Sequence, residues 1–286
     1  MIKSGTLSRG ALFGKPPASR CLLPTSIPLT LCLRHGVSHG QKPNSFDRNL
    51  IREYLQYQIL SIIFQHPSSR KLSFLGGTNL RIVHKLPRFS EDIDFDNKNL
   101  SFEEFLELGI FIEVELRKRG FLVENKLVEK KSFHCYIKFP ELLYQQGLSP
   151  LKEEKILIQI DTFDQGVSYE TEIFIINKFE FFDQILITPK SVILSQKLWT
   201  VTQRKLLKGR DFYDIMFLLQ NTKPDSMFLE SKFGTNNLKE IRELILSHLE
   251  DTDYNSLTKD LRPFLQYPNE AEKIKIFTEF LKQELN

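Results

Sequence analysis

The period of apolar and polar positions changes along the chain and divides it into two structured parts. Between residues 47 and 187, short runs in which apolar and polar side chains alternate lie between stretches of helical period. Alternation is typical of half-buried strands, and a period near 3.6 is typical of helices. After Thr188-Pro189, helical periodicity dominates. The pattern predicts an α+β fold: a mixed β-sheet domain with flanking helices over residues 46–188, followed by a C-terminal helical domain over residues 189–286.

The first predicted element is an amphipathic helix that begins at Asp47. Its apolar stripe consists of Leu50, Tyr54, Tyr57, Ile59 and Ile62. His66-Pro67 ends this helix, because a residue before proline disfavours helical backbone. A second helix is predicted from Ser101 to Arg119, where Glu104 lies three residues after Ser101 and completes a capping box.

The remaining elements follow from the same patterns. Strands are predicted over residues 71–75, 92–96, 121–129, 132–139, 155–161 and 171–177, where apolar side chains alternate with polar ones. A short helix is predicted to begin at the glycine pair of residues 76–77 and to end at His84. The helices of the second part are predicted over residues 190–206, 210–220, 236–249 and 269–284.

Residues 1–45 differ in composition from the rest of the chain. They are rich in Ser, Pro, Gly and Leu, contain no Asp or Glu, and show no sustained periodicity. Three interpretations fit: a transit-type presequence, a disordered tail, or a start codon assigned too far upstream. We favour the last, which requires a start codon other than that of Met, since the next methionine is Met216. We expect deletion of this segment to leave the melting temperature unchanged.

The distribution of charge excludes one class of function for the structured part. The whole chain has a net charge of +3, but six of its 39 basic residues and none of its 36 acidic residues lie in residues 1–46. Residues 47–286 therefore carry a net charge of −3, unlike a protein that binds nucleic acid through a basic surface. The structured part contains one cysteine, Cys135, and no apolar run of about 18 residues. We therefore expect a cytoplasmic protein without a membrane segment.

Two motifs near the start of the sheet domain suggest phosphate and metal chemistry. A predicted strand runs into Gly76-Gly77-Thr78, where a helix begins, and bare N–H groups at a helix start favour a phosphate. Asp92 and Asp94 lie two residues apart on the next strand, so their carboxylates point to the same face. Such a pair can hold one or two Mg²⁺ ions beside that phosphate. Taken singly, the motifs are also consistent with a turn and with a solvated strand face.

Asp161, at the end of an apolar strand, is the best candidate for a third acid. From a neighbouring strand it would complete the metal site, and it could activate the hydroxyl of an acceptor. It is also consistent with the cap of a helix or a turn. His84, His134 and His248 are too scattered along the chain for a zinc site.

Together and in this order, the motifs resemble those of the AbiEii/AbiGii toxin family. The resemblance is carried by Phe74-Leu-Gly-Gly-Thr-Asn-Leu-Arg81 and Arg88-Phe-Ser-Glu-Asp-Ile-Asp-Phe95. It continues at Lys197, in a predicted helix, and at Arg210-Asp-Phe-Tyr-Asp214 in the next one. Members of this family are nucleotidyltransferases of the DNA polymerase beta-like superfamily. The resemblance covers about residues 47–220 and implies a nucleotidyltransferase fold for the sheet domain.

The resemblance implies a role for each matching residue. Gly76, Gly77 and Thr78 would contact the phosphates of an NTP, Asp92 and Asp94 would bind metal, Lys197 would contact the triphosphate, and Asp211 would orient Lys197 or the acceptor. Arg88 and Ser90 would support the strand that bears the metal ligands. Fourteen residues separate Gly77 from Asp92, slightly more than the superfamily pattern, which indicates a longer loop.

Without the resemblance, two of these residues would be interpreted differently. Lys197 lies among apolar helix positions, so it would be interpreted as a lysine that extends to solvent. Asp211 would be interpreted as an acid that favours the first turn of a helix. Asp211 and Asp214 are three residues apart and share a helix face, which suits either a site or a solvated stripe.

The resemblance also implies a reaction and a cellular role. The reaction would be Mg²⁺-dependent transfer of a nucleoside monophosphate from an NTP, with two metal ions, to an RNA such as tRNA or to a protein. The role would be that of the toxin in a bacterial toxin–antitoxin or phage-defence system. A cognate antitoxin would be encoded alongside, and direct binding between the two need not occur.

Two alternatives remain open from the residues alone. An antibiotic-type nucleotidyltransferase would modify a small molecule, although the helical half is larger than a small acceptor needs. A degenerate member would only bind nucleotide or RNA, but the presence of Asp92, Asp94 and Asp211 argues against it.

Overall fold

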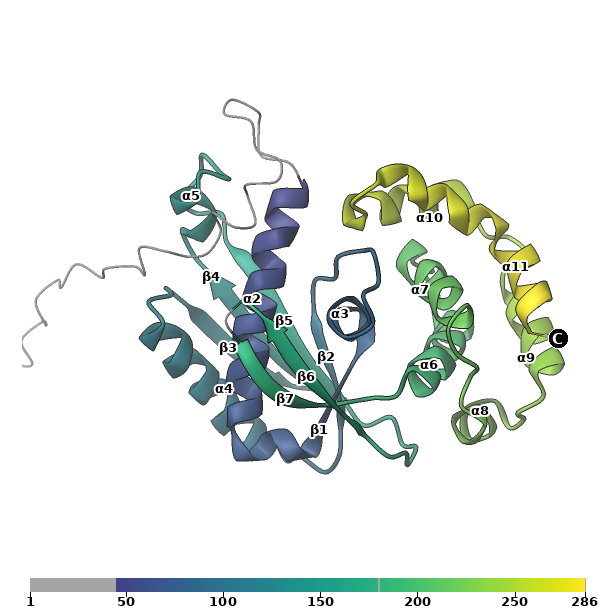
Figure 1. Ribbon diagram of the computed structural model, residues 1–286, viewed down its shortest axis with the longest axis horizontal. Coiled ribbons are helices and arrows are strands. Elements are labelled where there is room, and N and C mark those ends of the chain that lie inside the picture. Colours follow the sequence, from purple (N-terminus) through teal and green to yellow (C-terminus); the bar gives the residue numbers. More distant parts are fainter. Residues whose placement is uncertain (1–44, 180, 286) are drawn as a thin grey trace, which may run out of the picture.

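The computed structural model describes residues 45–179 and 181–285, in which seven strands form one mixed sheet (Figure 1). The strands are β1 (Leu72–Leu75), β2 (Ile93–Asn97), β3 (Glu124–Glu129), β4 (Phe133–Phe139), β5 (Ile156–Phe163), β6 (Glu172–Lys178) and β7 (Phe181–Ile187). Their order across the sheet is β3-β4-β5-β2-β1-β7-β6. The predicted α+β fold is confirmed. The predicted tail, residues 1–45, lies outside the described residues except for Ser45.

Helices lie on the sheet and follow it in the chain. The first set is α2 (Ser45–Gln65), η1 (Pro67–Lys71), α3 (Gly76–Ile82), α4 (Phe102–Lys118) and α5 (Leu142–Gln145). After β7 come α6 (Lys190–Gln203), α7 (Gly209–Leu219), α8 (Ser226–Phe233), α9 (Leu238–His248), α10 (Tyr254–Leu261), η2 (Arg262–Phe264), η3 (Pro268–Ile276) and α11 (Phe277–Glu284). None of the described helices is both long enough and apolar enough to cross a membrane.

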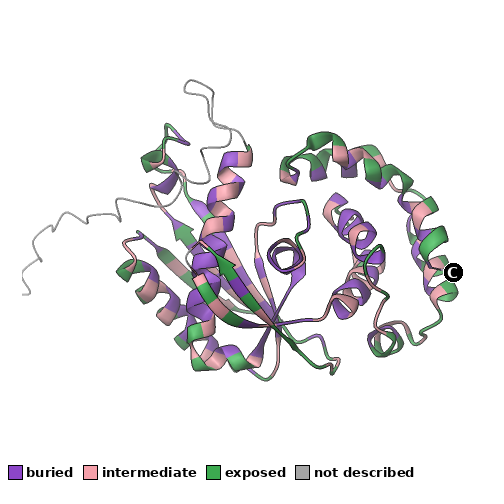
Figure 2. Cartoon of the chain, in the orientation of Figure 1, coloured by how far each residue is buried: buried purple, intermediate pink, exposed green. Residues whose placement is uncertain are grey.

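Helix α2 crosses the sheet and is buried on almost every side in its second half (Figure 2). Every residue from Leu55 to Ile63 is buried, because the helix packs against the sheet and also against α4. The predicted apolar stripe is therefore partly wrong: Leu50 and Tyr54 are only half-buried, whereas its other three positions are buried. The helix ends at Gln65, before His66-Pro67, as predicted.

Strand β2 brings the predicted acids to the middle of the sheet. It pairs in parallel with β5, and this pairing places Asp94 beside Asp161. Strand β5 pairs antiparallel with β4, and there Asp161 lies opposite His134. Residues in register on neighbouring strands point to the same face of a sheet. Polar side chains from β2, β5 and β4 therefore form a row on one face.

Buried apolar side chains form two clusters. The first lies between the sheet and the helices α2 and α4, and it contains Phe74 and Phe95. The second lies among the helices from α6 onward, whose outer faces are exposed (Figure 2). It also contains Leu75 and Leu80, so β1 and α3 meet the helical half directly. The glycine turn lies where the two clusters meet, and the predicted domain boundary near residue 188 stays a prediction.

Candidate active site

Gly76 begins α3 at a point where no side chain fits. Its φ is +79°, in the left-handed region that residues with a side chain rarely adopt. A Cβ atom at this position would lie 2.1 Å from the Oδ2 atom of Asp94. The glycine therefore allows the carboxylate of Asp94 to lie directly against the turn between β1 and α3.

Gly77 and Thr78 hold the segment that leads into β2. A Cβ atom on Gly77 would lie 2.7 Å from Nη2 of Arg88 and 2.8 Å from Oγ of Ser90. Thr78 is fully buried, and its hydroxyl donates to the backbone carbonyl of Asp92. The Gly-Gly-Thr motif thus packs the segment before β2 closely against the start of α3. The phosphate contacts expected for the motif stay predictions.

Asp92 and Asp94 line one polar cavity of about 410 Å³. Burial raises the pKa of Asp92 to about 6, and the negative charges of Glu91 and Asp161 add to this effect. Burial raises the pKa of Asp94 to about 7, and the charges of Asp92 and Asp161 contribute in the same direction. The carboxylates of Asp92, Asp94 and Asp161 thus repel one another and line one cavity.

Asp92 and Asp94 present to one cavity the kind of ligand that a divalent cation takes. Among the described residues, no ion pair joins either carboxylate to a basic side chain. Carboxylate oxygens are ligands that Mg²⁺ prefers, and Mg²⁺ commonly takes its remaining ligands from water and phosphate. Over residues 45–179 and 181–285, no group of three or more His, Cys, Asp and Glu side chains is arranged to hold a metal ion. Asp92 and Asp94 would therefore supply two ligands of a metal ion, and its other ligands would come from outside the protein.

Asp161 lies on the same face, but protein groups already contact both of its oxygens. Nδ1 of His134 lies 2.6 Å from Oδ1 of Asp161. Nε2 of Gln159 lies 2.9 Å from each oxygen of the same carboxylate. The role of Asp161 as a third metal ligand stays a prediction. His134 and Gln159 were not predicted as site residues, and the only signal for them in the sequence is their place on the polar face of two alternating strands.

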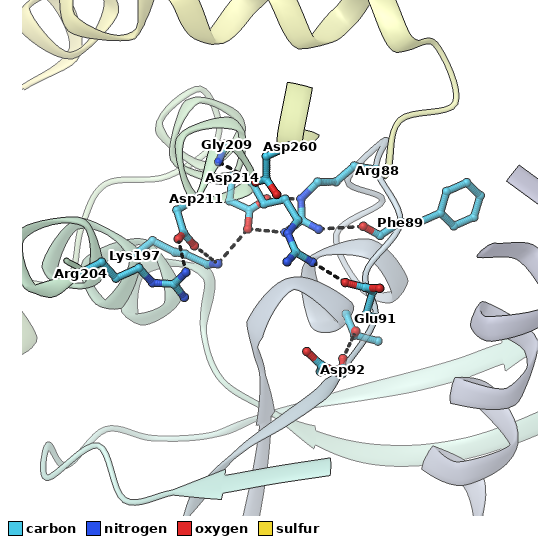
Figure 3. Close-up of polar contacts among 12 residues, drawn as sticks. Arg88, Phe89, Glu91, Asp92, Lys197, Arg204, Gly209, Asp211, Asp214 and Asp260 are labelled. Atoms are coloured by element: carbon cyan, nitrogen blue, oxygen red, sulfur yellow. Dashed lines mark hydrogen bonds and ion pairs between the residues drawn. The ribbon is translucent and has the colours of Figure 1, made fainter. Parts of the chain in front are cut away.

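Lys197 lies at the centre of a buried network of charges (Figure 3). Its Nζ atom lies 2.9 Å from one oxygen of Asp211 and 2.9 Å from one oxygen of Asp214, both on α7. Arg88 donates two hydrogen bonds of 2.6 Å to Asp214, and Arg204 lies 3.0 Å from Asp211. Three cations thus share two carboxylates, so the network carries one excess positive charge.

The network keeps its members charged in spite of burial. Burial alone would lower the pKa of Lys197, but the charges of Asp211 and Asp214 outweigh burial and raise it. Burial would likewise raise the pKa of Asp211, and the charges of Lys197 and Arg204 lower it instead. The side chain of Lys197 is 13% exposed and lines the cavity, so it is not a lysine that extends to bulk solvent.

The cavity has an acidic side from the sheet and a basic side from the helical half. Its lining consists of Gly77, Arg88, Ser90, Asp92, Asp94, Gln159, Asp161, Lys197, Arg204, Lys208, Arg210 and Asp211. Arg210, to which the resemblance assigns no role, pairs with Glu91 at 3.1 Å and stacks on the ring of Phe264 at 4.3 Å. A cation at one side and a polyanion at the other would each meet groups of opposite charge. A metal–phosphate complex has this distribution of charge.

Comparison with known proteins gives a family and a fold. A family model described as "Nucleotidyl transferase AbiEii toxin, Type IV TA system" matches residues 58–281, which is more than half of the chain. None of the curated proteins compared matches the sequence. The chain is similar to the crystal structure of JHP933 from Helicobacter pylori, with 17% identity and a TM-score of 0.50, over 83% of this chain and 93% of that chain. A second H. pylori structure, of a candidate nucleotidyltransferase, matches with 16% identity and a TM-score of 0.51, over 83% and 96% of the two chains. At these identities the likeness to the two structures concerns the fold.

Proposed function

The chain belongs to the AbiEii family of nucleotidyl transferase toxins, and we propose that it transfers a nucleoside monophosphate from an NTP to an RNA, such as tRNA, or to a protein. Membership makes the protein a nucleotidyltransferase and implies a nucleotide substrate and a cognate antitoxin. We propose in addition the acceptor, the dependence on Mg²⁺ and the roles of individual residues.

One observation carries this proposal: a single cavity joins two unpaired carboxylates to a cluster with excess positive charge. Asp92 and Asp94 would hold Mg²⁺. When bound there, Mg²⁺ would supply positive charge that polarises the α-phosphate and stabilises the charge developing on it. The cations of α6 and α7 would bind the rest of the triphosphate, because they face the same cavity.

Lys197 would stabilise the negative charge that develops on the leaving pyrophosphate. Its two contacts with Asp211 and Asp214 fix the ammonium group in position, and the network still has one positive charge to spare. These contacts support the role of Asp211 in orienting Lys197 rather than in binding the acceptor. Enzymes that transfer phosphoryl groups lower the barrier mainly by holding such charges in place before the transition state forms.

Membership of the family implies the cellular role in general terms. We propose a toxin that acts in a toxin–antitoxin or phage-defence system and whose antitoxin is encoded alongside, with or without direct binding. The negative net charge of residues 47–286 means that an RNA acceptor would be held by local contacts near the cavity.

Transfer assays test the proposal directly. The protein is incubated with each α-labelled NTP, Mg²⁺ and either total RNA or total protein, and the label in the acceptor is measured. We expect Asp94→Asn to abolish transfer and Lys197→Ala to lower its rate by about 10²–10³-fold, as for a lost charge-stabilising contact. Lys197→Arg should not restore the rate, because its planar group places the charge differently.

A surface lysine serves as the matched control. Lys118 on α4 has a side chain that is 66% exposed, so Lys118→Ala should transfer at the wild-type rate. Thermal melts of all variants separate loss of chemistry from loss of folding. Wild-type protein that labels no acceptor with any NTP would contradict the proposed function.

A further inference from the structure

His134 forms a hydrogen-bonded chain with two other side chains beside the cavity. Its Nδ1 atom lies 2.6 Å from Oδ1 of Asp161, and its Nε2 atom lies 3.0 Å from Oγ of Ser132. A carboxylate accepts at Nδ1 only if that nitrogen carries the proton, so the contacts assign the Nδ1–H tautomer to a neutral ring. Nε2 then carries the lone pair of the ring and accepts from the hydroxyl of Ser132, whose place an acceptor hydroxyl would take. A base that is held by a third group and lies within reach of a hydroxyl is the arrangement that activates nucleophiles.

The strand register places this base near the predicted metal ligands. Asp94, Asp161 and His134 lie side by side on β2, β5 and β4. Neighbouring strands are about 4.8 Å apart, so the backbones of Asp94 and His134 are separated by about 10 Å. A phosphate bound near Asp94 and the hydroxyl that attacks it would together span such a separation.

Several contacts hold the base and its partner rigidly. Gln159 donates to both oxygens of Asp161, and the same carboxylate contacts His134 on β4. The ring of His134 is stacked on Tyr136, with 6.1 Å between centroids and 26° between planes. The side chain of His134 is 17% exposed, so part of the ring is open to an acceptor.

From this geometry we propose that His134 is the catalytic base of the transfer reaction and that Asp161 is its positioning residue rather than a third metal ligand. The acceptor hydroxyl gives its proton to Nε2 of His134. Its oxygen forms a bond to the α-phosphorus of the NTP, the bond from that phosphorus to the oxygen bridging to the β-phosphate breaks, and pyrophosphate leaves. The proposal rests on the proposed function, because it assigns a step of that same reaction.

Single-turnover transfer to the acceptor fraction labelled by the wild type tests the assignment. We expect His134→Ala and Asp161→Asn each to lower the rate by about 10²-fold or more, the usual contribution of a positioned base. The double variant should be no slower than either single variant, because the two residues act as one unit. Imidazole added to the buffer should partly restore His134→Ala and should not restore Asp161→Asn.

Two further measurements separate this role from others. The melting temperature with and without Mg²⁺ reports metal binding independently of catalysis: the increase caused by Mg²⁺ should persist in both variants and disappear in Asp94→Asn. His66→Ala is the matched control, since His66 lies before η1 and contacts Ser68 and Phe111, outside the cavity. It should transfer at the wild-type rate.

Each contrary result has one meaning. Wild-type rates in His134→Ala would overturn the inference alone and leave the proposed function standing. Loss of the Mg²⁺ effect in Asp161→Asn would return Asp161 to the role of metal ligand and would also overturn the inference. Wild-type protein without any transfer would overturn the proposed function and this step with it.

Discussion

Asp94 lies against a glycine that has no room for a side chain, and this contact links the turn to the chemistry. Gly76 has a positive φ and would bring a Cβ atom to 2.1 Å from the carboxylate. A sequence pattern suggests glycine at such a turn because of backbone freedom or a nearby phosphate. The structure adds a steric reason: a side chain at position 76 would clash with Asp94, which lies on β2.

Replacing Gly76 with Ala should therefore impair transfer more than it lowers the stability of the fold. The φ of +79° makes alanine strained there, at a cost of about 1–2 kcal/mol. Gly234 is the matched control, because its φ is +71° and a Cβ atom there would meet nothing within 4 Å. We expect the two variants to share the strain cost in urea unfolding, whereas only Gly76→Ala displaces Asp94 and loses transfer. Normal transfer by Gly76→Ala would show that Asp94 is free to move aside.

Asp94 should also reduce the stability of the protein at high pH. Its pKa in the folded state is about 7, above its ordinary value of 3.8, chiefly because of burial. A carboxyl group with a raised pKa favours folding at pH values below its ordinary pKa, and this contribution is lost as the pH rises through 7. One pKa unit corresponds to about 1.4 kcal/mol, and solvent access reduces the total to about 1–2 kcal/mol.

Asp94→Asn should therefore raise the melting temperature more at about pH 8 than at about pH 5, because the loss that begins above the ordinary pKa of 3.8 is only partly complete at pH 5. Mg²⁺ should raise the melting temperature of the wild type at pH 8 more than that of the variant. A variant that melts below the wild type at pH 8 without Mg²⁺ would contradict this assignment. Calorimetric scans at the two pH values provide the measurement.

Among the elements, α4 shows how a local sequence signal can define a helix end. Ser101 accepts a hydrogen bond of 3.2 Å from the backbone of Glu104, and the Glu104 side chain accepts one of 2.9 Å from the backbone of Ser101. This capping box was predicted and is present. Ser101→Ala should cost about 1 kcal/mol of folding free energy, whereas Ser101→Thr should cost little, because threonine keeps the accepting oxygen. Urea unfolding of both variants measures the difference, and equal losses would contradict the capping role.

Elements without such local signals were missed or misjudged. Strand β7 begins with Phe181-Phe182 and shows no clean alternation, yet it pairs with β6 along its length and with β1. Helices α8 and α10 have eight residues each, and helices this short depend on packing rather than on their own sequence. The predicted helix over residues 269–284 is divided at Ile276, where ψ is 16° and the following Phe277 packs on Phe212.

At the scale of the whole molecule, the site depends on contacts that no local pattern specifies. The order of motifs was enough to suggest Asp92, Asp94, Lys197 and Asp211 as site residues. The contact between His134 and Asp161 requires the register of β4 on β5, and Arg88 meets Asp214 across 126 residues of sequence. Sequence reasoning therefore suggested the residue types of the chemistry and Asp211 as a partner of Lys197, but not the contacts of His134 with Asp161 or of Arg88 with Asp214.

Arg88 and Asp214 form a buried ion pair that joins the segment before β2 to α7. Their side chains are 3% and 0% exposed, so removal of either partner leaves a buried charge. Such a loss typically costs about 3–5 kcal/mol, because an uncompensated charge cannot regain its hydration. Arg88 and Asp214 differ in the contacts that each keeps when the other is replaced.

That difference predicts which substitution is worse. Without Arg88, Asp214 keeps the ammonium group of Lys197 at 2.9 Å. Without Asp214, the guanidinium of Arg88 keeps one hydrogen bond among the described residues, of 2.8 Å to the backbone carbonyl of Phe89. We therefore expect Asp214→Ala to lower the free energy of unfolding more than Arg88→Met does, with denaturant titration of both variants and the double variant as the measurement. The double variant should lose less than the sum of the two, since neither charge of the Arg88–Asp214 pair is then left without the other. A larger loss in Arg88→Met would mean that Lys197 does not compensate Asp214, and the shared network that holds Lys197 at the cavity would have to be abandoned.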